Sequence, residues 1–178
     1  ALFCKFNRAN AEERKQVIVS KAAAALDAGL DVSKKGNFGK AKGFRSQEQI
    51  KWRLSNPNKR YLALRLRTDE ASYIIFSISG DKMIIFDFFF KVPESGKTLI
   101  RFLNDEAASK QFKGIISFCQ ENSNDSKTLK SLGFINNPFS FGPLNERVPF
   151  IQFSNEENME KYKNASDWLV TSYDHDSL

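Results

Sequence analysis

A chain of 178 residues is long enough for one packed domain and short for two. Its 41% of apolar residues is ordinary for a folded globular protein, and no apolar run approaches the roughly 20 residues of a membrane-spanning helix. A single histidine and two distant cysteines, Cys4 and Cys119, match no metal-ligand or redox spacing, so we expect no metal site, reduced thiols and a cytoplasmic location.

The N-terminal residues are predicted to form a strand, a long helix and a loop. Residues 2–6 are apolar enough for a short strand. Residues 10–30 predict one helix, because Asn10 is a suitable cap, acids follow it, alanine is dense and Gly29 can end the helix. Glycines and many lysines make residues 31–44 a loop or hairpin.

A short helix and a group of three strands are expected next. Ser46 can cap a helix over 47–56, which Pro57 would end. Turns short enough for an antiparallel meander separate the strands, which are predicted at 60–67, 72–79 and 82–90. The first alternates apolar and basic residues, as a half-exposed strand does, and the third is apolar on both faces, as a covered central strand is.

Helices and strands alternate in the rest of the chain. The predicted elements are helices at 96–112 and 126–133, strands at 113–120, around 134–141 and at 147–153, and a tail with a helix at 155–164 and an extended piece at 167–173. This order predicts an α/β (α+β) fold with a mixed, mostly antiparallel central sheet and helices on both faces. We expect a single domain over 1–178, with an N-terminal part (1–44), a core (45–153) and a tail (154–178). Because the chain opens on alanine, a fragment of a longer protein is kept open.

The net charge of +6 is spread unevenly. From Asp31 to Thr68 there are eleven lysines and arginines against two acids, a local balance of +9, whereas residues 154–178 hold six acids against two lysines, a balance of −4. A basic segment of this density favours a polyanionic partner such as nucleic acid, a membrane surface or a phosphorylated cofactor. A solvated, lysine-rich helix and hairpin is the alternative.

Three local segments carry a resemblance. After the strand at 113–120, Asn122 precedes a short helix that ends in Leu132-Gly133-Phe134, and Gly133 suits a left-handed helix cap. Earlier, Trp52 and Arg53 lie on a helix before Asn56-Pro57, and Tyr61 opens the next strand. Near the end, Trp168, Thr171, Asp174 and Asp176 form the third pattern.

These segments and the element order resemble the GNAT superfamily of acyl-CoA N-acyltransferases. The last two resemble a subgroup linked with bacterial surface-polysaccharide assembly. The resemblance spans about residues 45–178 and implies a GNAT-like sheet. On the residues alone, we expect Trp52 to anchor its amphipathic helix in the core, with substrate contact as the alternative.

The segment "KVPESGKT" raises the question of a phosphate-binding loop. A nucleotide-binding P-loop needs glycine at position 91, where this chain has lysine, and Pro93 removes one backbone donor. The resemblance implies instead a degenerate pyrophosphate loop before a helix, whose N–H groups and dipole would face coenzyme A. The implied cofactor-binding residues are Phe88, Phe89, Phe90, Lys91, Ser95, Gly96, Lys97, Thr98 and Asn122. An ordinary strand-to-helix turn is the alternative.

Acyl transfer to an amine needs a general base and a general acid, and few residues of the chain are candidates. Asp87 is the natural base, because a carboxylate inside an apolar strand is costly unless it is functional or paired. A buried structural salt bridge with an arginine such as Arg53 is the alternative. Glu121 is a weaker candidate. Leu129 stands where the resembled family has a tyrosine acid, so Tyr173 or His175 would have to replace it.

The leading hypothesis is an acyltransferase that moves an acetyl or related acyl group from acetyl-CoA or another acyl-CoA to an amine. An amino sugar of a polysaccharide precursor is an acceptor that the subgroup resemblance implies. A nucleic-acid-binding module without enzymatic activity is the main alternative, with the basic segment and aromatics that could stack on bases: Phe38, Phe44, Trp52 and Tyr61. A Fem-type aminoacyl transferase is also kept, and the oligomeric state is not predicted.

Overall fold

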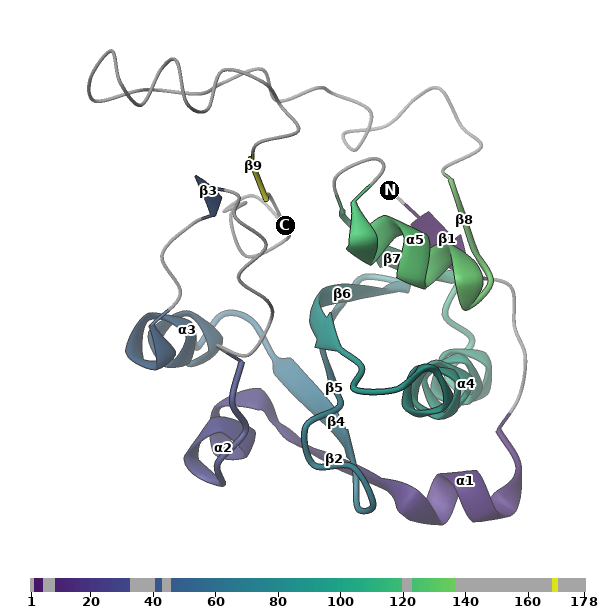
Figure 1. Ribbon diagram of the computed structural model, residues 1–178, viewed down its shortest axis with the longest axis horizontal. Helices are drawn as coiled ribbons and strands as arrows, with labels where there is room; N and C mark the ends of the chain where they lie inside the picture. The colour runs from purple at the N-terminus through teal and green to yellow at the C-terminus, as the bar shows by residue number, and fades with distance from the viewer. Residues whose placement is uncertain are drawn as a thin grey trace.

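The computed structural model describes residues 2–4, 9–32, 41–42, 46–119, 123–136 and 168–169, of which 2–4, 41–42 and 168–169 are described by their backbone alone. Seven strands of this part form one sheet in the order β2-β4-β5-β6-β7-β1-β8 (Figure 1). These strands are β1 (Leu2–Cys4), β2 (Val17–Lys21), β4 (Tyr61–Leu66), β5 (Tyr73–Ser79), β6 (Lys82–Phe89), β7 (Gly114–Ser117) and β8 (Phe134–Asn136). Only β6 and β7 run parallel, so the predicted mixed, mostly antiparallel sheet is confirmed.

Helices cover both faces of the sheet, as predicted (Figure 1). The helices are α1 (Ala11–Gln16), α2 (Ala22–Asp27), α3 (Gln47–Leu54), α4 (Pro93–Ser109) and α5 (Asn124–Ser131). One hydrophobic cluster joins the sheet to α4 and α5, and a second joins its other face to α2 and α3. Strand β4 alternates between them, since Leu64 and Leu66 belong to the first cluster and Tyr61 and Ala63 to the second.

The prediction of one helix over 10–30 is wrong. Residues 17–21 leave the helix and form β2, which pairs antiparallel with β4 from Val17↔Leu66 to Lys21↔Leu62. The β-branched residues of this segment fit a pleated strand better than a helix, and pairing with β4 outweighs the helix propensity of the alanines on either side. The two ends were predicted correctly: Asn10 caps α1 with a capping box, and Gly29 follows α2 with a φ of 85°.

The meander β4-β5-β6 and the capping of α3 by Ser46 follow the sequence predictions. Helix α4 was expected to begin near Gly96 but begins at Pro93, because proline is well suited to the first position of a helix. A separate pair of short parallel strands is formed by β3 (Ala41–Lys42) and β9 (Trp168–Leu169). The strand expected at 147–153 and the helix expected at 155–164 lie outside the described residues.

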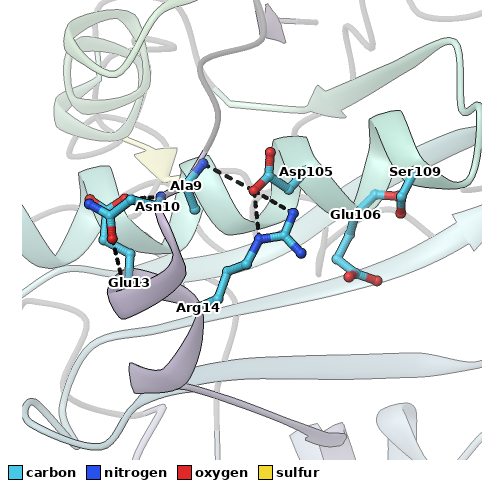
Figure 2. A network of polar contacts seen from close by, with 7 residues as sticks. All are labelled: Ala9, Asn10, Glu13, Arg14, Asp105, Glu106 and Ser109. Atoms are coloured by element: carbon cyan, nitrogen blue, oxygen red, sulfur yellow. Dashed lines mark hydrogen bonds and ion pairs between the residues drawn. The ribbon is translucent and has the colours of Figure 1, made fainter.

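The N-terminal segment runs from one end of the sheet, where β1 is the last strand but one, to the opposite edge at β2, and it is attached to α4. Strand β1 lies between β7 and β8, and the chain then passes α1 and enters β2. Figure 2 shows the fastening point: one carboxylate oxygen of Asp105 accepts hydrogen bonds from the Ala9 backbone N–H (3.1 Å) and from Nε and Nη2 of Arg14 (3.0 and 2.7 Å). Glu13 makes a second link through Arg101 at 2.8 Å.

Candidate active site

The pairing between the two parallel strands ends at the carboxyl end of β7, before β6 ends. Pairing between β6 and β7 runs from Lys82↔Gly114 to Ile85↔Ser117, whereas β6 continues to Phe89. The β5–β6 register shifts in the same stretch: Phe76 lies opposite Ile85, but the preceding Ile75 lies opposite Asp87. Such a β-bulge bends a strand and re-aims its side chains, and bulges of this kind are common beside active sites. The carboxyl ends of parallel strands are also where open α/β sheets bind ligands.

Asp87 directly follows the bulge and is 1% exposed. Its carboxylate accepts a hydrogen bond of 2.8 Å from the hydroxyl of Tyr73, which is 0% exposed. Both side chains lie on the face covered by α2 and α3, since Tyr73 and Ile75, the partner of Asp87, belong to that cluster. A buried carboxylate with a tyrosine donor is a proton-accepting group held in a fixed position. Sequence reasoning selected Asp87 and missed Tyr73.

The three predicted phenylalanines at the end of β6 point to opposite faces. Phe88 is buried in the cluster under α4 and α5, and its ring stacks on Phe90 with centroids 5.1 Å apart. Phe89 packs against the opposite cluster, with Tyr73 as its register partner. The strand end therefore separates a face shared with α4 from a face shared with Asp87.

A polar network fixes the connection from β6 to α4. Asp69, in the β4–β5 turn, accepts hydrogen bonds from the hydroxyls of Ser72 (2.5 Å) and Ser95 (2.6 Å) through the same oxygen. Ser72 Oγ in turn accepts from the backbone N–H of Lys91 at 2.8 Å. Burial raises the pKa of Asp69, but these hydroxyls and the backbone N–H groups of Ala71 and Ser72 outweigh it and hold the pKa below its ordinary value.

Gly96 lies where α4 packs against its surroundings. A Cβ at this position would stand 2.9 Å from Cδ2 of Phe90 and 3.2 Å from Cδ1 of Leu132. Packing between α4, β6 and α5 therefore requires glycine here, and the residue itself is buried. The glycine of the Gly-Lys-Thr sequence is therefore explained by packing, without a nucleotide-binding motif.

The start of α4 offers backbone donors and two exposed lysines. Val92, the N-cap, makes no side-chain capping hydrogen bond, and Pro93 has no N–H. Lys91 is exposed, and Lys97 is exposed but forms an ion pair with Glu94 at 3.2 Å. The Ser95 hydroxyl already donates a hydrogen bond to Asp69. The groups left to bind a ligand at this helix end are therefore backbone N–H groups and the ammonium groups of Lys91 and Lys97. Thr98 is half-buried in the second turn.

Several predicted site residues cannot be located. Asn122, Glu121, Tyr173 and His175 lie outside the described residues, as do Phe38 and Phe44 of the nucleic-acid alternative. Leu129, at the position of the missing tyrosine acid, lies on α5 and is fully buried in the cluster between α4, α5 and the sheet.

Trp52 contradicts the prediction that it anchors α3. Its side chain is 80% exposed, whereas Ile50 and Leu54 form the buried face of the same helix. Residues two apart on a helix lie on opposite sides, so Trp52 points away from the core. Tyr61 shows the reverse: it is buried, with its ring edge against Phe86 at 4.8 Å between centroids, and is not available for stacking on a base.

A second polar group on the α2–α3 face was not anticipated. Arg65 of β4 is half-buried, and neither its buried Nε nor the buried Oγ of Ser20 on β2 has a hydrogen-bond partner. The alternating pattern of 60–67 suggested that the basic residues point to solvent, but both faces of β4 are covered. Arg65 therefore lies beside the Tyr73–Asp87 pair rather than on an open surface.

No protein-family model, curated protein or solved structure matches the chain. Among the described residues, no group of three or more His, Cys, Asp or Glu side chains could hold a metal ion. None of the helices in the described ranges is both long and apolar enough to cross a membrane.

Proposed function

We propose that the chain is a GNAT-like N-acyltransferase that binds an acyl-CoA where β6 and β7 separate. The observation that carries the proposal is the end of the β6–β7 pairing at Ile85↔Ser117, followed by a bulged β6 that leads into α4. This arrangement places the unpaired end of β6 beside a helix N-terminus, and it leaves one face of β6 for each substrate.

Coenzyme A lies on the α4 side in this proposal. The backbone N–H groups of the first turn of α4, together with Lys91 and Lys97, bind the pyrophosphate. Successive N–H groups of a strand point to opposite edges, so residues 88–90 include a donor directed to the β7 side, where it polarises the thioester carbonyl. Asp69 and Glu94 reduce the positive potential at this helix end, and we therefore expect modest rather than tight binding.

The acceptor amine lies on the α2–α3 side. Its nitrogen attacks the thioester carbonyl carbon, a C–N bond forms, the C–S bond breaks, and the thiolate of coenzyme A leaves. The nitrogen loses one proton. Because the buried Tyr73 hydroxyl already donates a hydrogen bond to Asp87, that proton passes to the Tyr73 hydroxyl while Tyr73 gives its own proton to Asp87. The thiolate is then protonated from solvent or from a residue beyond those described.

A cytoplasmic location belongs to the same proposal, since the chain has two cysteines at no disulfide-rich or metal-binding spacing. Nucleic-acid binding is the second candidate function, since Trp52 is exposed on a helix that also carries Lys51 and Arg53. Charge on that helix is partly neutralised, because Lys51 forms an ion pair with Asp27 at 2.5 Å. The acyltransferase proposal is therefore the better supported of the two.

The test is release of free thiol from acetyl-CoA in the presence of a panel of amino sugars, amino acids and polyamines. An amine-dependent thiol release that falls about 100-fold or more in Asp87→Asn supports the proposal. The matched control is Asp81→Asn, since Asp81 lies in the β5–β6 turn and forms an exposed ion pair with Lys113. Equal activity of the two variants would remove Asp87 from the mechanism, and absence of thiol release with every amine would count against the acyltransferase itself.

A further inference from the structure

Two buried polar atoms without partners lie side by side on the α2–α3 face of the sheet. Ser20 Oγ and Arg65 Nε are buried, and neither has a hydrogen-bond partner. Ser20 of β2 is paired with Ala63 of β4. Arg65 lies two residues beyond Ala63 on β4, opposite Ile18. Side chains at such diagonal positions share a face and are close enough for a long side chain to bridge.

The absence of partners is unfavourable unless something supplies them. A buried polar group without a hydrogen bond costs about 1–3 kcal/mol, and buried groups of this kind are therefore almost always satisfied. Ser20 is the last residue but one of β2, and α2 begins immediately after that strand, so the apolar residues Ala22, Ala25 and Leu26 cover this region. A site with two donors beneath apolar cover selects a ligand that accepts hydrogen bonds.

The chemistry of the two groups favours an anion. The guanidinium of Arg65 donates in a planar fork that matches a carboxylate or a phosphate. The Ser20 hydroxyl can donate to the same group. No acidic residue forms a salt bridge with Arg65 within the described ranges, so the charge has no competing partner there.

Arg65 and Ser20 lie on the same face of the sheet as Asp87, where the proposed function places the amine that accepts the acyl group. Arg65 lies in register with Tyr73 on the next strand, and Tyr73 donates to Asp87 on the strand after that. Neighbouring strands are about 4.8 Å apart, and Asp87 lies two residues along β6 from the partner of Tyr73, so the backbones of Arg65 and Asp87 are roughly 12 Å apart. We propose that Arg65 and Ser20 bind the carboxylate or phosphate of the acceptor, whose amine then faces Tyr73 and Asp87. This inference rests on the proposed function and narrows its acceptor to small anionic amines, the size of an amino acid or an amino sugar phosphate.

The experiment titrates the purified chain with inorganic phosphate and, separately, with acetate, at an ionic strength held constant with chloride. Binding is followed by backbone amide chemical shifts, which report millimolar affinities. The variants are Arg65→Met, which keeps the aliphatic stem, Arg65→Lys and Ser20→Ala. The matched control is Arg60→Met, because Arg60 is exposed at the start of the same strand.

We expect saturable binding of one of the two anions, with shifts centred on β2 and β4, and the preferred anion identifies the acceptor group. Affinity should fall about tenfold or more in Arg65→Met and several-fold in Arg65→Lys and Ser20→Ala, but not in Arg60→Met. Binding of neither anion, or binding that is unchanged in Arg65→Met, would overturn the inference.

A stability measurement distinguishes a ligand site from a structural role. Without ligand, Ser20→Ala should leave the free energy of unfolding unchanged or raised, since it removes a hydroxyl without a partner. Ser72→Ala should lower it, because that hydroxyl contacts both Asp69 and the Lys91 N–H. A clear loss of stability in Ser20→Ala would mean that the hydroxyl has a structural partner and would contradict the inference. Anion binding needs no acyl donor, so its outcome is independent of whether acetyl-CoA binds.

Discussion

The hydroxyl of Tyr73 donates a hydrogen bond of 2.8 Å to the carboxylate of Asp87, and the two side chains belong to neighbouring strands at the point where β6 is bulged. Tyr73 pairs in register with Phe89 and not with Asp87, so the contact is diagonal across the two strands. The bulge in β6 therefore lies beside Asp87, the proton acceptor of the proposed acyl transfer.

The Tyr73–Asp87 pair should show energetic coupling. Tyr73→Phe and Asp87→Asn each remove one side of a buried hydrogen bond, and each single change should cost about 1–3 kcal/mol of unfolding free energy. In the double variant the second change should cost less, leaving a coupling energy of at least about 1 kcal/mol. Urea denaturation of the wild type and the three variants measures it, and additive losses would show that the contact does not hold in solution.

Gly96 should resist substitution. An alanine in a helix interior is ordinarily favoured over glycine by about 1 kcal/mol, but here its Cβ would meet the Phe90 ring at 2.9 Å. We therefore expect Gly96→Ala to lower the free energy of unfolding by about 1–3 kcal/mol. Adding Phe90→Leu should recover part of the loss in the double variant. A stabilising Gly96→Ala would instead mean that the three elements are less closely packed than described.

The fastening of α1 to α4 depends on Asp105. Its side chain is 3% exposed, and replacing it with alanine leaves the Ala9 N–H and Arg14 without their acceptor. We expect a loss of about 1–3 kcal/mol in unfolding free energy for Asp105→Ala. Glu12→Ala is the control, since the Glu12–Lys15 pair is exposed on both sides and should contribute less than about 0.5 kcal/mol. Similar losses for the two variants would contradict the role of the Asp105 contacts.

The two faces of α3 should differ in their sensitivity to substitution. Leu54→Ala removes a buried side chain and should cost about 2–5 kcal/mol, whereas Trp52→Ala should change stability by less than about 0.5 kcal/mol. The comparison on one helix controls for helix propensity. A large loss in Trp52→Ala would show that this indole is covered in solution.

Acid should reveal the depressed pKa of Asp69. Because its folded-state pKa lies below the unfolded value of about 3.9, ionised Asp69 stabilises the fold above that pH, and this contribution disappears as the pH falls through the lower folded pKa. The stability difference between wild type and Asp69→Asn should therefore be constant above about pH 5 and shrink below about pH 4. Ser95→Ala, which removes one donor, should shift this decline to higher pH. A difference independent of pH would contradict the assignment.

Much of the fold follows from local patterns, because apolar periodicity and caps act over a few residues. The β4-β5-β6 meander, α4 and the caps at Asn10 and Ser46 were predicted in this way. Residues 17–21 were not, since their strand depends on pairing with β4, a partner more than forty residues away in the sequence. The insertion of β1 between β7 and β8 is likewise a tertiary arrangement that no local pattern reveals.

The candidate site was less accessible to sequence reasoning. Asp87 was recognisable, because a carboxylate in an apolar strand is unusual. Tyr73 and Arg65 carried no such signal, since tyrosine is common in strands and an arginine in an alternating run suggests exposure. Their importance arises from strand register, which places Arg65 opposite Tyr73 and Asp87 diagonally across from Tyr73 on the next strand. The packing role of Gly96 also gave no signal in the sequence, because the contacts of its missing Cβ come from Phe90 and Leu132.

The most direct test of the central claim is the affinity for acetyl-CoA, measured by calorimetric titration of the wild type and of a double charge reversal at the start of α4. The account predicts saturable binding that weakens at least about tenfold in Lys91→Glu/Lys97→Glu, since both exposed ammonium groups lie beside the proposed pyrophosphate site. The control is Lys110→Glu/Lys113→Glu at the opposite end of the same helix, which should bind as the wild type does. No binding to the wild type, or equal weakening in both double variants, would contradict an acyl-CoA site where β6 and β7 separate.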